Sequence, residues 1–443
     1  MTLDEASSQE LLAGVLAVAN RLAPGADVWV RLESGRAANT RFAIRGITST
    51  GDVTENTLTI ALAFGRRRAQ TATNQLDPHS VEEAIVRLRT MARLTPEDPE
   101  YMPTLGPQTY SSVPNAYDPI LDRLGAPERA DGAKNSLVAA RKAGVHIAGF
   151  IYHETAFQAL ASSAGLSAHH LATTASFTAT ARTPDGTGSG WGIASGNRWR
   201  DIDIDAVAGI AIDKAVRSQN VRALPPGRYT VVLEPAAVAG LLYFLTDSLD
   251  ARRADEGRSF FSSTGGGNKV GERLFGEHVT LSSDPTRAET PGSPFDVEGL
   301  PLRSVTWIDR GKLAALAYTR YWAAKQGKKP TGAPSGYELT GSDGNAADLL
   351  RGVKKGILIT RFWYTRWLDQ QTMMVTGLTR DGVFLIENGV VTTPVNNFRF
   401  NESPVNMLAR ADVFTRKTTQ IYDIRVPALR THDFNLASVS KAV

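Results

Sequence analysis

RYTVVLEPAAVAGLLYFLTDSLDARR, residues 228–253, predicts a strand that leads directly into a helix. The β-branched, apolar run Tyr229–Leu233 is typical of a strand, and Glu234-Pro235 marks the turn after it. From Ala236 to Ala251 the apolar residues recur at intervals of three and four, which is the period of a helix with one buried face. We therefore expect the second half of the chain to be organised around this strand and helix.

A second cluster of signals extends to Asp309. It consists of a glycine-rich loop at 264–268, a short strand at 278–281 and the turn sequence GSPFDVEGLP at 292–301. Glycine and proline near both ends of the last segment predict a tight turn. Further β-rich runs separated by turns, one of them at 313–318, continue towards the C-terminus, so the second half is predicted to be β-rich.

The order of these segments resembles that of the TldD/PmbA (modulator of DNA gyrase) family. In that family a similar strand and helix precede a turn like FDVEGLP at 295–301. The resemblance continues through GILIT at 356–360, TGLTRDG at 376–382, IENG at 386–389 and TPV at 393–395. The ordered set covers nearly all of the chain from Tyr229 onward and is far more specific than any single segment.

One motif divides this family, and the chain lacks it. TldD-like members carry HExxxH on the helix after the paired leucines, where two histidines and a glutamate would hold zinc. Here the window after Leu242 contains no imidazole, and the chain contains no cysteine to supply a thiolate. The resemblance therefore implies the TldE/PmbA-like branch, with no catalytic residue, metal ligand or cofactor of its own. The degenerate zinc-motif positions are Tyr243, Phe244, Asp247 and Ser248.

In the family such a member accompanies a zinc-bearing TldD-like subunit in a complex that cuts peptides. The resemblance thus implies a non-catalytic, metal-free subunit of a metallopeptidase complex, with a TldD-like partner and a peptide substrate. We expect an α+β fold with an N-terminal α/β domain at 1–222. A β-rich domain with a curved, largely antiparallel sheet is expected at 228–443. Two prolines and a glycine in Arg222–Gly227 interrupt both helix and strand and mark the boundary.

The N-terminal half is predicted to contain helices and strands in mixed order. Helical patterns occupy 8–22, 130–144 and 205–218, and Ser80 is expected to cap a further helix. Strand-like runs occupy 27–32, 41–47 and 57–64, with a turn at 50–52 between the second and third.

Composition sets broad limits on function. The chain has 443 residues, of which 42% are hydrophobic and 21% charged, and its formal net charge is +4. This is the composition of a folded protein, and its basic runs lack the interleaved aromatics of single-strand binders, so nucleic-acid binding is not expected. The absence of cysteine fits a reducing compartment. No apolar run is long enough to span a membrane and no signal peptide is recognisable, so we expect a cytoplasmic protein.

Two rival functions remain open. Asp296 and Glu298 are closely spaced carboxylates that could serve as acid and base in a metal-independent hydrolase, although the family resemblance makes them part of a structural turn. The other rival is a homodimeric peptide-binding protein of a biosynthetic pathway. The aromatic residues Phe362, Trp363, Tyr364 and Trp367 are expected in the core or at a partner interface.

Three further patterns resemble metal-binding or phosphate-binding motifs, but each departs from the motif it resembles. His153-Glu154 begins a near miss of HExxxH in which Gln158 stands in place of the second histidine, so His153 is expected to be a hydrogen-bonded residue at the surface or a strand end. The adjacent His169 and His170 would point to opposite faces of a strand. The glycine tract at 265–271 lacks the spacing of a phosphate-binding loop and is expected to be a flexible loop beside a substrate groove.

Overall fold

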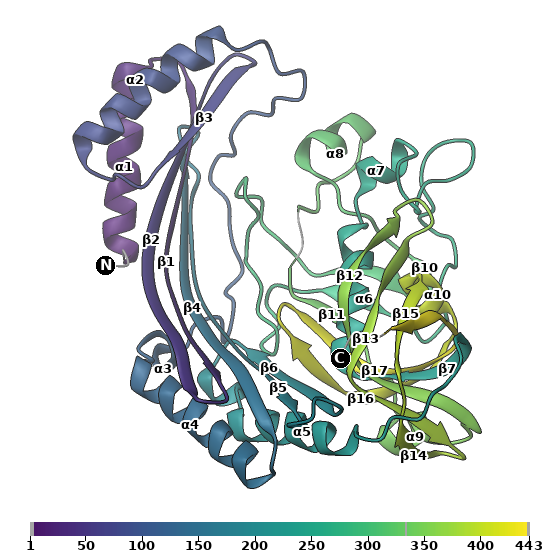
Figure 1. The fold of residues 1–443 in the computed structure, drawn as a ribbon. Coiled ribbons are helices and arrows are strands. Elements are labelled where there is room, and N and C mark those ends of the chain that lie inside the picture. Colours follow the sequence, from purple (N-terminus) through teal and green to yellow (C-terminus); the bar gives the residue numbers. More distant parts are fainter. Residues whose placement is uncertain (1–3, 333–334, 441–443) are drawn as a thin grey trace.

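The computed structural model describes residues 4–332 and 335–440. Two β-sheets form the molecule, one of six strands from the N-terminal half and one of eleven from the C-terminal half, and helices pack against both (Figure 1). The predicted α+β class, with a β-rich C-terminal half, is confirmed. Residues 1–3 and 441–443 of the two predicted domains lie outside the described residues, and the boundary at 222–228 stays a prediction.

The N-terminal sheet is antiparallel throughout, in the order β3-β2-β1-β4-β5-β6. Alternate side chains of its long strands face opposite sides, so that Val28, Val30 and Leu32 are fully buried on one face. The chain reverses between β1 and β2 at residues 44–45, and the turn predicted at 50–52 lies within β2 instead. The strands are β1 (Asp27–Ala43), β2 (Gly46–Phe64), β3 (Arg67–Thr73), β4 (His146–Ser162), β5 (Ser167–Arg182) and β6 (Ser189–Gly196).

The longer helices of this half cover one face of the sheet (Figure 1). α1 (Glu5–Leu22) and α2 (Pro78–Leu94) pack on one end of that face, and α4 (Ala126–Lys142) and α5 (Ile204–Arg217) pack on the other. The short α3 (Pro119–Asp122) precedes α4, and a 3₁₀ turn, η1 (Trp199–Asp201), precedes α5. The opposite face of the sheet carries no helix of this half and is covered by the irregular segment around residues 101–110 and by the C-terminal half of the chain.

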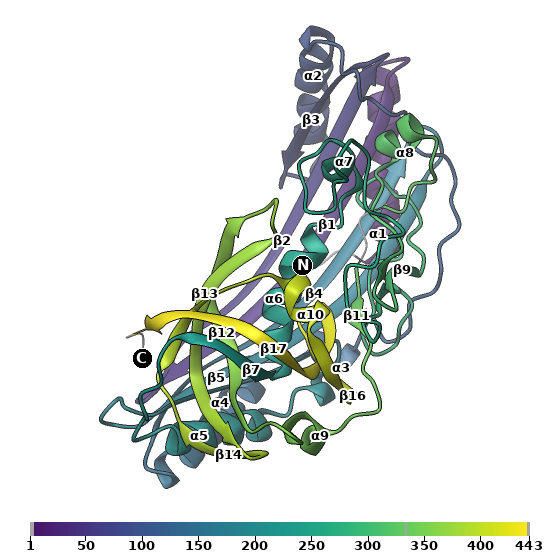
Figure 2. The same ribbon diagram turned by 90° about the vertical axis from the view of Figure 1, so that its right-hand side faces the viewer.

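The larger sheet is mostly antiparallel and curves back on itself. Its path runs β10-β9-β8-β11-β17-β15-β13-β12-β7, and β17 also pairs with β7, so five strands form a closed ring of pairings. Only the β7–β12 and β11–β17 pairs are parallel among the described strand pairings. Figure 2 shows these strands in front of the long N-terminal strands. The strands are β7 (Gly227–Leu233), β8 (Leu281–Ser283), β9 (Val305–Asp309), β10 (Lys312–Leu313), β11 (Tyr337–Leu339), β12 (Lys355–Asp369), β13 (Met374–Glu387), β14 (Val390–Pro394), β15 (Asn397–Glu402), β16 (Ala411–Ile421) and β17 (Ile424–Ser440).

The helix predicted after β7 lies at the centre of this half. α6 (Pro235–Asp247) buries Val238, Leu241 and Leu242 completely, in a core that also takes side chains from β7, β12 and β17. The shorter helices are α7 (Ala251–Asp255), α8 (Arg320–Gln326), α9 (Ala346–Leu350) and α10 (Pro404–Ala409). Within the described ranges, no helix is both long and apolar enough to cross a membrane.

Charged and polar contacts join the two halves beside α5 and β6. Lys214 of α5 donates to Glu234 at the start of α6, with 2.6 Å between Nζ and Oε2. Asp381 of β13, which is 1% exposed, accepts from Ser189 of β6 and also pairs with Arg361. Removing one member of a buried pair leaves an uncompensated charge, which costs more than the intact pair contributes. These contacts therefore favour one relative position of the halves over alternatives.

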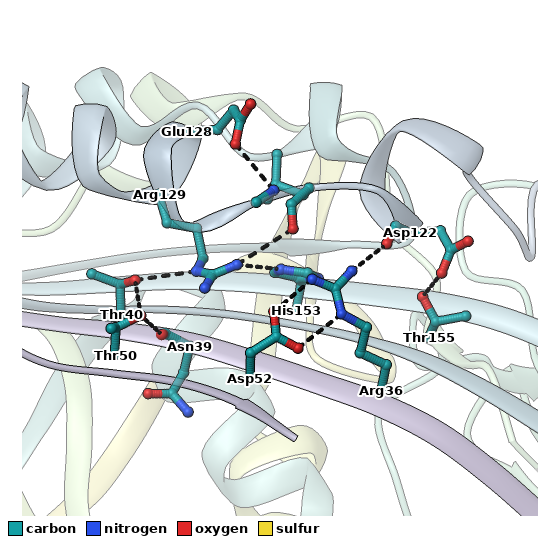
Figure 3. Close-up of polar contacts among 12 residues, drawn as sticks. Arg36, Asn39, Thr40, Thr50, Asp52, Asp122, Glu128, Arg129, His153 and Thr155 are labelled. Carbon is teal, nitrogen blue, oxygen red and sulfur yellow. Dashed lines mark hydrogen bonds and ion pairs between the residues drawn. The ribbon is translucent and has the colours of Figure 1, made fainter. Parts of the chain in front are cut away.

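A buried polar cluster ties α4 to the N-terminal sheet (Figure 3). The guanidinium of Arg129 is inside the protein, where it donates to Thr40 Oγ1 at 3.1 Å and to His153 Nε2 at 2.9 Å. An arginine can only donate, so His153 accepts through Nε2 and carries its proton on Nδ1. His153 is 1% exposed and sits within β4, so the expected place at the surface or a strand end is wrong.

Burial, together with the nearby charge of Arg129, lowers the pKa of His153 from 6.5 to about 4. The unfolded chain therefore binds a proton more tightly than the folded chain between these two values. This contribution to stability is complete above about pH 6.5 and is lost as the pH falls towards 4.

We predict that the free energy of unfolding decreases less in His153→Gln, which keeps an acceptor for Arg129, than in the unmodified protein. Between pH 6.5 and 4 the difference should reach up to ~3 kcal/mol. Denaturant unfolding at a series of pH values measures this difference. His79→Gln, on a side chain that is 84% exposed, is the matched control and should follow the unmodified chain. Identical pH dependence of His153→Gln and the unmodified protein would contradict the assignment.

Candidate functional site

The four degenerate zinc-motif positions lie at the C-terminal end of α6 and do not converge. Tyr243 is 61% exposed and Asp247 is also exposed, whereas Phe244 and Ser248 are buried. The Ser248 hydroxyl donates to the carbonyl of Phe244 at 2.9 Å, and the Asp247 carboxylate lies 3.6 Å from Arg253. The Asp247 and Ser248 side chains are thus engaged locally rather than directed to a common point.

These residues do not fit a catalytic zinc. Such a site takes about three nitrogen, sulfur or carboxylate ligands around one point and leaves a position open for water. Over residues 4–332 and 335–440, no group of three or more His, Asp or Glu side chains is placed to hold a metal ion. In place of a ligand, Phe244 packs edge-on against Trp367 of β12, with ring centroids 4.9 Å apart.

The aromatic residues of β12 divide between core and surface. Phe362 and Trp367 pack against the C-terminal core, while Trp363 and Tyr364 are 39% and 66% exposed. The guanidinium of Arg380 lies 4.1 Å from the centre of the Trp363 ring. Exposed aromatics beside arginine are typical of surfaces that bind another protein.

Asp296 organises the turn at 292–301. Its Oδ1 accepts the backbone N–H groups of Glu298 and Leu300, both at 2.9 Å. Gly299 has a φ of +84°, and a Cβ there would lie 2.6 Å from Leu166 of the N-terminal half, so glycine is required by both conformation and space. The turn has the structural role that the family resemblance implies, and it is also part of the contact between the two halves.

The second carboxylate of the turn is placed differently. Glu298 faces a cleft between the two halves, and its carboxylate lies 3.7 Å from the guanidinium of Arg320. Burial raises the pKa of Glu298, an effect that Arg320 partly opposes. Burial also raises the pKa of Asp296, against the effect of its backbone hydrogen bonds. Asp296 is thus committed to the turn, and Glu298 is the carboxylate with access to a ligand.

The remaining candidate segments have structural roles in this conformation. In the glycine tract, Asn268 donates to Asp255 at 2.6 Å and Lys269 donates to the carbonyl of Phe260 at 2.6 Å. In the described chain no helix begins directly after this tract, so it lacks the helix N-terminus that a phosphate loop uses. His169 lies 3.3 Å from Glu5 of α1.

Comparisons with known proteins agree with this architecture. The model of the "PmbA/TldA metallopeptidase C-terminal domain" matches residues 226–438, and that of the "PmbA/TldA metallopeptidase central domain" matches residues 120–219. A metalloprotease of Methanothermobacter thermautotrophicus is 28% identical over 131 residues, 29% of this chain and 28% of the relative. An uncharacterised protein of Methanocaldococcus jannaschii is 30% identical over 139 residues, 31% of this chain and 32% of the relative. The matched region thus spans about a third of the length of these curated relatives.

Solved structures share the whole fold. TldE of Thermococcus kodakarensis has a TM-score of 0.85 at 17% identity, covering 97% of this chain and 100% of that one. A protein of Thermotoga maritima described as a putative modulator of a DNA gyrase has a TM-score of 0.86 at 17% identity, covering 97% and 99%. Together with the two matched domain models, which account for most of the sequence from residue 120 onward, these findings place the chain in the PmbA/TldD family.

Proposed function

We propose that this chain is the metal-free, non-catalytic subunit of a TldD/TldE-like metallopeptidase complex that processes or degrades peptides. The observation that carries the proposal is the end of α6, where Tyr243, Phe244, Asp247 and Ser248 occupy the window in which TldD-like members hold zinc. A subunit without ligands needs a partner that has them. We infer that the partner is a TldD-like chain.

The exposed aromatic side chains support pairing with another protein. Tyr243 on α6 and Trp363, Tyr364 and Leu368 on β12 are all more than a third exposed. Tyrosine, tryptophan and arginine are enriched among the residues that dominate binding energy at interfaces. A second copy of this chain could also be the partner, which is the homodimeric alternative.

The rival function, a metal-independent hydrolase, rests on Glu298. This carboxylate faces a cleft and has a raised pKa, as a general acid requires. Its proposed companion, Asp296, accepts two backbone hydrogen bonds within the turn. The pair is therefore poorly suited to share acid and base roles.

We predict that the purified chain contains far less than one equivalent of zinc and does not cleave unfolded peptides alone. Mixed with a TldD-like partner, it should permit cleavage that depends on the partner's zinc. Elemental analysis and mass spectrometry of the peptide products measure these outcomes, with the partner alone as the control. Zinc near one equivalent after mild chelation, or cleavage by the isolated chain, would refute the proposal.

A second prediction separates the turn from the chemistry. Asp296→Ala leaves two backbone donors without their acceptor and should lower the free energy of unfolding by about 1–3 kcal/mol. Glu298→Gln disturbs only a loose ion pair and should change it by less than about 1 kcal/mol. Denaturant unfolding of both variants tests this. The hydrolase becomes the better hypothesis if the isolated chain cleaves peptides and Glu298→Gln abolishes cleavage without unfolding the protein.

A further inference from the structure

A cleft of about 570 Å³ separates the helix-free face of the N-terminal sheet from the C-terminal half. Its floor is formed by β1, β2 and β3, and its other walls are residues 101–104, the tip of the turn at 297–298, and Arg320 at the start of α8. This volume is within the range of sites that bind small ligands or short peptide segments. Neither the helix α6 nor any residue of the degenerate zinc motif lines it.

Two residues that line this cleft each carry a buried donor without an acceptor among the described residues. The indole Nε1 of Trp29 and the Nε of Arg31 are both buried and make no hydrogen bond there. Trp29 and Arg31 are two residues apart on β1, so their side chains project from the same face of the sheet. An unpaired buried donor costs about 1–3 kcal/mol, so an acceptor that reaches these two N–H groups when the cleft is occupied would remove that cost.

The arginines of the cleft favour a negatively charged acceptor. The Nη2 of Arg31 lies 2.6 Å from the Glu33 carboxylate, which holds the guanidinium in place. The Nε of Arg31 takes no part in this ion pair and has no hydrogen-bond partner among the described residues. Arg320 is only 12% exposed, and its Nη2 donates to the carbonyl of Pro103 at 2.7 Å. Its Nη1 lies 3.7 Å from Glu298, which is longer than a charge-assisted hydrogen bond. Both guanidinium groups therefore retain capacity to bind an anion.

The carboxylates of the cleft do not occupy the anion-binding positions of Arg31 and Arg320. Asp27 accepts hydrogen bonds from Tyr101, Thr104 and Ser163, so its oxygens are already occupied. Glu298 is the carboxylate left facing the cleft. Val297 beside it is 58% exposed and offers an apolar contact next to the charged groups. The cleft thus presents donors and cations together with an adjacent apolar residue.

We propose that this cleft binds a carboxylate group of a peptide, with the Trp29 and Arg31 N–H groups and Arg320 as donors and Val297 against an adjacent apolar side chain. The choice of a peptide over other carboxylates rests on the proposed function. The carboxylate can come from the C-terminus of the peptide or from an acidic side chain. Binding here would hold the peptide against the N-terminal sheet without any role for metal.

The test measures binding of dye-labelled tripeptides to the full chain by fluorescence anisotropy. The first probe ends in leucine with a free carboxylate, the second is its C-terminal amide, and the third is an amide with an internal glutamate. The free acid should bind about tenfold more tightly than the plain amide. Tight binding of the third probe as well would assign the site to side-chain carboxylates too, and its weak binding would restrict the site to the C-terminus.

Variants of the cleft should change affinity in opposite directions. Trp29→Phe keeps an aromatic ring but removes the indole N–H, and Arg31→Gln removes the charge, so each should weaken binding of the free acid by about tenfold. Glu298→Gln removes a repelling charge and should strengthen it. Arg41→Gln, at an exposed position farther along the same strand, is the control and should have no effect. If Trp29→Phe does not fold, Arg68→Gln on β3 provides a second variant of the cleft wall.

Four results would overturn the inference. Three are equal affinity for the free acid and the plain amide, unchanged affinity in Arg31→Gln, and weaker binding in Glu298→Gln. The fourth is absence of binding by every probe, which would mean that the cleft does not bind carboxylates. None of these results bears on zinc-dependent cleavage with a TldD-like partner, so the inference and the proposed function can fail separately.

Discussion

The face of the N-terminal sheet that carries no helix determines how the two halves of this protein meet. Phe295 is 3% exposed because it packs with Leu160 and Leu166 on that face. Tyr110 adds an edge-on ring contact to Phe295 at 5.2 Å and a hydrogen bond to the carbonyl of Gly299 at 2.8 Å. Since the apolar part of a sheet face must be covered by another element, the turn at 292–301 is required for the fold independently of any chemistry.

Local sequence pattern predicts the elements better than their ends. The strand at 229–233 and the helix after it are present, but α6 ends at Asp247 rather than Ala251, and the Ser248 hydroxyl there bonds back to the chain. Asp77, not Ser80, caps α2, because Pro78 occupies the first turn of the helix. The strand predicted at 313–318 is reduced to Lys312–Leu313. Caps and strand ends depend on which side chain reaches a backbone group, and periodicity does not contain that information.

The two candidate sites also differ in how far the sequence predicts them. The absence of histidine in the window after Leu242 is visible in the sequence because the residues concerned are contiguous on one helix. The cleft is not visible, because its donors come from β1 and from the start of α8, which lie far apart in the chain. The local signal is that Trp29 and Arg31 alternate with Val28, Val30 and Leu32. This pattern indicates that the second face of the strand is neither part of an apolar core nor fully exposed to solvent.

The absence of histidine and glutamate from the end of α6 has a structural consequence as well as a chemical one. A ligating histidine or glutamate must point towards a water-accessible position and be oriented by further hydrogen bonds. Phe244 instead turns inward against Trp367, so this turn of the helix is stabilised by packing and does not depend on a metal. The exposed surface around Tyr243 and the cleft beside Glu298 are both open to other molecules. The end of α6 thus has two sides, because Phe244 and Ser248 belong to the packed interior while Tyr243 and Asp247 face outward, where another molecule can reach them.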